Sequence, residues 1–236
     1  NLPRPGAVII GEPTEMQVVD AHKGINSFVT TVIGHEAHSS LTHYGVNAVM
    51  TAGRLIAFLG DLAEEKAANP ERNSRFNPPY STIHVGTVEG GTALNIVSRL
   101  CEFKWEIRAL PGDDPAETVA RLNEFCEREL LPAMRKVAPE TEIETVSKLT
   151  VPALSPDPGS PAEQLAFALT GTNATHAVSY ATEGGQFQEA GLPAVVCGPG
   201  SIEQAHKPNE FISLQQVAAG KEFARRLIAR CQDMEV

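Results

Sequence analysis

Apolar and polar residues alternate most regularly over residues 98–109. One set of alternate positions is apolar and consists of Cys101, Phe103, Trp105 and Ile107. The other set is mostly polar and includes Glu102, Lys104 and Glu106. A period of two residues is typical of a strand that buries one face. We therefore predict a strand here, in a sheet with one solvated face.

A helical period marks residues 46–66. The apolar positions close to one stripe are Val46, Val49, Met50, Gly53, Ala57, Leu59 and Leu62. This spacing predicts an amphipathic helix, and Asn69-Pro70 is expected to end it. A second helix, over about 113–131, is expected to begin at Asp113-Asp114-Pro115, an acidic cap followed by proline.

The predicted elements of this block follow one another as strand, helix, strand, strand, helix, strand. Further strands are expected at 25–33, 82–88 and 141–149. This order is that of a split βαβ, ferredoxin-like domain. We assign residues 22–150 to such an α+β domain.

The segments on either side of this domain alternate between strand and helix. Strands are expected at 7–10, 175–180 and 193–197, helices at 161–170 and 213–232, a linker at 152–161 and a glycine loop at 183–185. Alternation of this kind indicates an α/β layer. We therefore predict that residues 1–21 and 151–236 form one discontinuous α/β domain, into which the α+β domain is inserted.

The 236-residue chain is acidic, with 19 Lys and Arg against 29 Asp and Glu and a net charge of −10. This balance argues against a nucleic-acid binder driven by overall charge. No apolar run approaches the ~18 residues of a membrane span. The sequence opens on Asn1-Leu2-Pro3 without a basic, apolar stretch, so we expect no signal peptide in it. The four cysteines form no Cys-x-x-Cys pair. We expect a cytoplasmic protein with reduced, mostly buried thiols.

Two segments could carry polar chemistry, and each has an ordinary structural alternative. Gly11-Glu12-Pro13-Thr14 places a carboxylate just after a strand, where ligands collect at a sheet edge. A surface turn is the alternative. The loop 34–45 contains His35, His38 and His43. Functional groups often lie on such loops, but a solvated surface loop is the alternative.

Three further segments could bind a metal or a substrate. His206 follows the Gly198-Pro199-Gly200 turn, and its imidazole could face a metal. The turn 90–95 could hold a carboxylate or a phosphate through backbone N–H groups, although a hairpin turn is the stronger interpretation. Arg108 could clamp a carboxylate or simply be exposed at a strand end. The sequence contains no Gly-x-Ser-x-Gly, P-loop or dinucleotide-binding motif.

The order and spacing of these segments are far more specific than any segment alone. The chain resembles the dinuclear-zinc amidohydrolases and peptidases of the M20 type over essentially its whole length. The matching segments are Gly11-Glu12-Pro13-Thr14, His22-Lys23-Gly24, residues 34–40 and 45–48, residues 90–95, Arg108 before Leu110-Pro111-Gly112, Thr182-Glu183-Gly184-Gly185, and residues 197–200 with 205–210. Within the family, residues 76–82 and 105–108 resemble the acetylornithine deacetylases most.

The resemblance implies a role for five residues. Glu12 and His206 would each be a ligand of one of two zinc ions, for which cobalt is a possible substitute. His38, on the inserted lid domain, would stabilise the oxyanion in the partner subunit's site. Asn95 and Arg108, also on the lid, would bind polar groups of the substrate. The implied protein is a cytoplasmic homodimer that deacylates an N-acyl amino acid, with N-acetylornithine favoured, as a step of arginine biosynthesis.

Other ligands that the resemblance requires are missing from the sequence. No His is followed two residues later by Asp, and no Asp or Glu precedes Glu12. The one Glu-Glu pair, Glu64-Glu65, lies in a predicted lid helix. The chain therefore resembles the C-terminal portion of such an enzyme, and it is expected to be inactive alone.

Two alternatives stay open. The substrate could be that of another enzyme in the family, such as a succinyl-diaminopimelate desuccinylase, an aminoacylase or a carboxypeptidase. The chain could also be a non-catalytic dimerising or binding module, because half of the metal site is absent.

Overall fold

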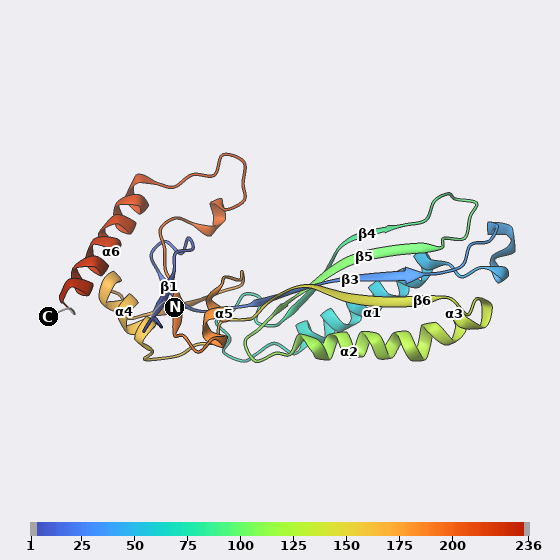
Figure 1. The fold of residues 1–236 in the computed structure, drawn as a ribbon, viewed down its shortest axis with the longest axis horizontal. Coiled ribbons are helices and arrows are strands. Elements are labelled where there is room, and N and C mark those ends of the chain that lie inside the picture. The colour runs from blue at the N-terminus through green and yellow to red at the C-terminus, as the bar shows by residue number, and fades with distance from the viewer. Residues whose placement is uncertain (1–3, 234–236) are drawn as a thin grey trace. The chain divides into compact units, whose positions relative to one another are not determined.

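The computed structural model describes residues 4–233, which divide into two compact units (Figure 1). The first unit contains the described residues up to Gly24, residues 75–77 and the residues from Val151 onward. The second unit contains residues 25–74 and 78–150. An α+β domain is therefore inserted into a mixed α/β one, which is the predicted fold class.

The second unit contains the predicted strand-helix-strand-strand-helix-strand order. Its strands are β3 (Gly24–Ile33), β4 (Thr82–Gly90), β5 (Leu100–Ala109) and β6 (Glu142–Val151), paired in the order β4-β5-β3-β6. Its helices are η1 (Ser39–Tyr44), α1 (Ala48–Ala68), α2 (Pro115–Phe125), the π-helical turn η2 (Cys126–Leu130) and α3 (Leu131–Val137). Figure 1 shows α1 and α2 running along one side of this sheet.

The alternation in β5 arises because the strand buries one face and exposes the other, as predicted. The apolar positions, such as Phe103 and Trp105, are buried, whereas the polar positions between them are half-buried or exposed. Trp105 stacks on Phe28 of β3, and its Nε1 donates to Thr30 Oγ1 at 3.0 Å. The buried face packs with Leu55 and Leu59 of α1 into the main hydrophobic core.

The helix expected over 113–131 is interrupted and ends later, at Val137. Its start is as predicted, since the Asp114 side chain caps α2 and Pro115 follows. Pro132 has no N–H, so the regular hydrogen-bond ladder cannot continue through it. The chain instead widens into η2, where the Leu131 N–H donates to the Cys126 carbonyl.

The first unit has a four-stranded sheet in the order β1-β8-β2-β7. Its strands are β1 (Val8–Ile10), β2 (Val18–His22), β7 (Thr175–Val178) and β8 (Ala194–Val196), and its helices are α4 (Pro161–Thr170), α5 (Gly184–Glu189), η3 (Ile202–Gln204) and α6 (Leu214–Asp233). β1 runs parallel to β8, and β2 runs parallel to β7 but antiparallel to β8.

Sequence reasoning missed β2 and α5. All five residues of β2 are buried, and two of them are the polar Asp20 and His22, so neither alternation nor an apolar run marks the strand. The 183–185 segment was predicted as a loop because of its glycines. Gly185 instead allows close packing, since an added Cβ would lie 2.2 Å from the Pro152 carbonyl oxygen.

The boundary predicted at 22–150 differs from the observed units in two places. Residues 22–24 and 75–77 group with the first unit. Arg75 explains the second difference, because its Nη1 forms an ion pair with the buried Asp20 at 2.8 Å and donates to Thr175 Oγ1 at 3.0 Å. In addition, the Ser179 hydroxyl donates to the Asn77 carbonyl at 2.6 Å.

All four cysteines are free thiols. Cys101, Cys126 and Cys197 are buried, as expected, whereas Cys231 is exposed on α6. Burial raises the pKa of Cys126 and of Cys197 to about 11, which keeps both thiols protonated at neutral pH. Among residues 4–233, no helix combines the length and apolar character needed to cross a membrane.

Candidate functional site

Two bridged loops carry His38 and Asn95 at one end of the sheet in the second unit. The first loop, 34–45, follows β3, and the second joins β4 to β5. The Ser39 N–H donates to the Asn95 carbonyl at 3.0 Å, and His38 forms an isolated β-bridge with Ile96. Two residues predicted from separate motifs are therefore brought together on one surface.

The first loop is also anchored through its histidines. His38 is the N-cap of η1, and its ring nitrogen Nδ1 contacts Ser40. His35 Nδ1 lies 2.7 Å from Oε1 of Glu140, which precedes β6 by two residues. The pKa of Glu140 is lowered, first by a backbone hydrogen bond and then by His35. Because His35 and Glu140 are exposed, we expect this pair to contribute little to stability.

Arg108 lies at the opposite end of β5. It pairs with Thr82 at the start of β4, whereas Cys101 pairs with Gly90 at the end of β4. At 3.4 Å per residue, the strand separates Leu100 from Arg108 by about 27 Å. A substrate of amino-acid size therefore cannot contact Arg108 and Asn95 of the same chain.

The Arg108 guanidinium is held by its neighbour on the same face of the strand. Its Nε and Nη2 donate to the two Glu106 carboxylate oxygens at 2.9 and 3.1 Å. Both side chains are about one-third exposed. The second Nη atom has no such partner on Glu106, so part of the guanidinium remains available to another carboxylate.

Glu12, in the first unit, lies two residues beyond β1 in a turn that is bonded to the turn after β8. The Thr14 N–H donates to the Gly198 carbonyl at 3.1 Å, and the Gly198 N–H donates to Thr14 Oγ1 at 3.1 Å. The backbones approach so closely that a Cβ on Gly198 would lie 2.4 Å from the Gly11 oxygen. Glu12 itself is half-buried.

His206 follows η3 and is exposed. Its backbone is in the left-handed region at φ 63°, and its N–H donates to Glu210 Oε2 at 3.2 Å. A non-glycine residue in this conformation is uncommon and indicates a locally constrained loop. The loop belongs to the same unit as Glu12.

Glu12 and His206 offer the oxygen and nitrogen donors that zinc prefers. However, no three His, Cys, Asp or Glu side chains converge to hold a metal ion within the part of the chain that the structure describes. A catalytic zinc normally has three protein ligands. The described residues therefore do not form a zinc site by themselves.

Two further polar residues of the first unit lie outside the five predicted site residues. Burial raises the pKa of Tyr180, and the charge of Glu12 raises it further, so the phenol lies within electrostatic reach of Glu12. His22 is fully buried, its Nδ1 lies 2.9 Å from the Lys23 carbonyl, and burial lowers its pKa. His22 lies in the His22-Lys23-Gly24 segment that carries the resemblance, whereas no motif marks Tyr180.

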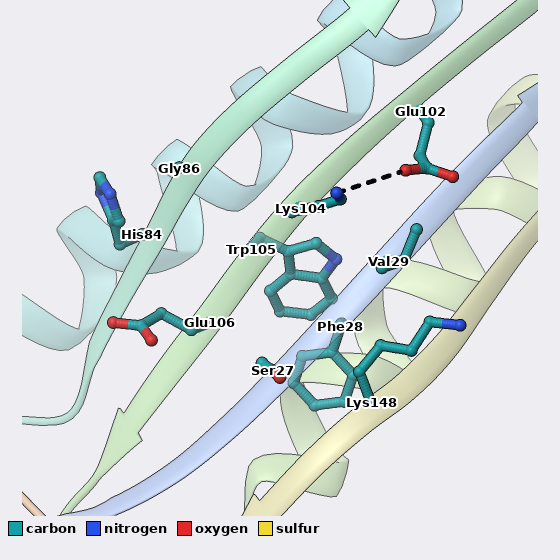
Figure 2. Close-up of a pocket in the computed structure, with 10 residues that line it drawn as sticks. All are labelled: Ser27, Phe28, Val29, His84, Gly86, Glu102, Lys104, Trp105, Glu106 and Lys148. Atoms are coloured by element: carbon teal, nitrogen blue, oxygen red, sulfur yellow. Dashed lines mark ion pairs between the residues drawn. The ribbon is translucent and has the colours of Figure 1, made fainter.

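A pocket of about 690 Å³ opens on the sheet of the second unit, and none of the five predicted site residues lines it. Figure 2 shows polar and charged side chains from β4, β5 and β6 around it, including His84, Glu106 and Lys148. Their mixed charges favour no single class of ligand. A second pocket, of about 530 Å³, lies nearer the Asn95 loop and is lined partly by residues 90–92 and Arg99.

Sequence comparison matches residues 20–134 to a peptidase dimerisation domain of the M20 type. The chain is 35% identical over 225 residues to the acetylornithine deacetylase of Edwardsiella ictaluri. That alignment covers 95% of this chain and 57% of the relative.

The chain therefore contains an M20 dimerisation domain and is similar to acetylornithine deacetylases over nearly all of its length.

A second relative, the acetylornithine deacetylase of Myxococcus xanthus, is 33% identical over 97% of this chain and 58% of its own length. The chain thus spans little more than half the length of these relatives. A tripeptidase from Staphylococcus aureus has a similar structure, with a TM-score of 0.68 at 18% identity over 94% of this chain and 56% of that one. An aminopeptidase from Bacillus cereus gives 0.67 at 19%, covering 93% and 55%. At these identities the structures show the fold alone.

The contact at Gly198 gives a test of how the two turns are held together. We expect Gly198→Ala to lower the free energy of unfolding by about 1–3 kcal/mol, because the added methyl group would overlap the Gly11 carbonyl. Gly6→Ala is the matched control, since a Cβ at Gly6 meets nothing within 4 Å. Urea unfolding of both variants measures the difference, and equal stabilities would contradict the packing described here.

Proposed function

We propose that this chain is part of a metal-dependent amide hydrolase that deacylates an N-acyl amino acid. N-acetylornithine is the favoured substrate, and its products would be ornithine and acetate, as in arginine biosynthesis. The observation that carries the proposal is the 35% identity to an acetylornithine deacetylase over 95% of this chain. We also place the enzyme in the cytoplasm.

The proposal includes two zinc ions, or cobalt in their place, with Glu12 and His206 among the ligands. Zinc at such sites lowers the pKa of a bound water and polarises the carbonyl group. Since the described residues do not form a whole zinc site, the proposal requires ligands from outside them. The 236-residue chain alone is therefore proposed to be inactive.

The separation along β5 supports a dimeric active site. One chain cannot bring Arg108 and the His38–Asn95 loops to the same small substrate, because about 27 Å of strand lies between them. In a homodimer, one subunit can supply Arg108 and the other can supply His38 and Asn95. We propose this arrangement, with Arg108 and Asn95 binding the substrate and His38 donating to the oxyanion.

An apolar surface at the same end of the second unit supports dimerisation there. Exposed apolar side chains from η1, α1, β4 and the β4–β5 loop gather at this end: Leu41, Tyr44, Met50, Val88 and Leu94. We call these residues the loop-end patch. β4 is also an edge strand, which leaves backbone groups free to pair with another chain. Exposed apolar patches of this kind mark interaction surfaces.

A charge in the loop-end patch should therefore break the dimer. Leu94 is fully exposed in the single chain, and we expect Leu94→Glu to weaken dimerisation about 100-fold or more, because a buried unpaired carboxylate costs several kcal/mol. Leu214→Glu is the control, since Leu214 is 87% exposed but lies on α6 in the other unit. Analytical ultracentrifugation at micromolar concentration measures both. A wild-type monomer, or an unchanged dimer in Leu94→Glu, would contradict the proposed interface.

The catalytic role of His38 has its own test in the complete enzyme. We expect His38→Ala to lower kcat by about 10²–10³, because one oxyanion donor is lost. KM and bound metal should change little, since the interaction forms mainly in the transition state. His43→Ala, on the same exposed loop, is the control and should retain activity. Near-normal turnover of His38→Ala would contradict the role, and loss of metal would make His38 a ligand instead.

A second candidate function is a non-catalytic dimerising module. It is favoured by the absence of three converging metal ligands from the described residues. The kinetics of the complete polypeptide discriminate between the two, because a binding module would show no turnover of N-acetylornithine with added zinc.

A further inference from the structure

The His38 ring is held by a single residue through two contacts. Its Nδ1 accepts a hydrogen bond from the Ser40 backbone N–H at 3.2 Å. The same Nδ1 lies 2.8 Å from the Ser40 hydroxyl oxygen. Within residues 4–233, these are the hydrogen bonds that the His38 side chain makes.

These two contacts determine where the ring carries its proton. A neutral imidazole has one N–H donor and one acceptor nitrogen. A backbone N–H can only donate, so Nδ1 must be the acceptor. The hydroxyl of Ser40 then also donates to Nδ1, and the proton of the neutral ring resides on Nε2.

We propose that Ser40 is a positioning residue that fixes His38 in the Nε2–H tautomer, with this N–H directed away from its own loop. The functional meaning of this inference rests on the proposed role of His38. An oxyanion needs a preorganised donor, and Ser40 would present the Nε2–H in advance, without a change of tautomer. Ser40 would touch neither substrate nor metal, and it would act only through His38.

The neighbouring serine provides an internal comparison. Ser39 uses its backbone N–H to bond the Asn95 carbonyl, which joins the two loops. Its hydroxyl forms no hydrogen bond within the described chain, and both serines are exposed. Loss of the Ser39 hydroxyl should therefore leave the His38 ring unchanged, whereas loss of the Ser40 hydroxyl removes the shorter of the two contacts to Nδ1.

The direct test is the ¹⁵N NMR spectrum of the histidine ring in the 236-residue chain, recorded well above the ordinary histidine pKa of about 6.5. The inference predicts a protonated Nε2 and a hydrogen-bonded, unprotonated Nδ1 for His38. Ser40→Ala should shift the Nδ1 resonance toward that of an unbonded nitrogen. Ser40→Thr should restore the wild-type shift, and Ser39→Ala should not alter it. A wild-type Nδ1–H tautomer, or an unchanged Nδ1 resonance in Ser40→Ala, would overturn the proposal.

Kinetics of the complete enzyme separate this inference from the proposed function. Loss of the one neutral hydrogen bond should lower kcat roughly threefold to tenfold in Ser40→Ala, with KM unchanged. Ser40→Thr should recover most of the activity. If the NMR shifts occur but neither Ser40→Ala nor His38→Ala affects kcat, the role of Ser40 stands and the catalytic role of His38 is wrong. If the shifts do not occur, the role of Ser40 is wrong whatever the activity.

Discussion

The length of one β-strand constrains the whole candidate site. An extended strand rises by a fixed amount per residue, so β5 holds Arg108 far from the loops that carry His38 and Asn95. Side-chain motion cannot bridge a separation of about 27 Å. If all three residues act on one small substrate, the site must be assembled from two chains. Dimerisation would then be a condition of catalysis as well as a source of stability.

The loops at the far end of the sheet are built to keep their polar groups in place. Backbone hydrogen bonds join the His38 and Asn95 loops, and Ser40 occupies the acceptor nitrogen of His38. The exposed apolar side chains of the loop-end patch lie beside them. A surface that exposes apolar side chains beside a hydrogen-bonded histidine suits a residue that acts on a partner's site. In the first unit, the turn that carries Glu12 is held against the turn after β8. This close contact is possible because Gly198 has no side chain.

Sequence reasoning succeeded where a pattern is local. The alternation around Trp105 predicted β5 and its buried face, and Asp114-Pro115 marked the start of α2. It failed where contacts between distant segments determine the local structure. The helix predicted to end near 131 continues through the turn η2 and α3 to Val137, the buried polar strand β2 has no recognisable period, and Arg75 joins the first unit through Asp20. The residues of the candidate site came from motif order, but their grouping did not. The strand predicted over 98–109 already separates Arg108 from the Asn95 turn, but nothing in the sequence places His38 beside Asn95, because the hydrogen bonds between the two loops set that contact.

Complementation between two inactive variants tests the shared site most directly. Arg108→Ala and His38→Ala subunits of the complete enzyme, each with a different affinity tag, are mixed and the mixed dimer is purified. If each site takes Arg108 from one subunit and His38 from the other, one site of the mixed dimer has both residues intact and activity returns. A mixed dimer of His38→Ala with Asn95→Ala should stay inactive, because these two residues serve the same site from the same subunit. An inactive mixture of Arg108→Ala with His38→Ala would show that both residues come from one chain, and it would contradict this account.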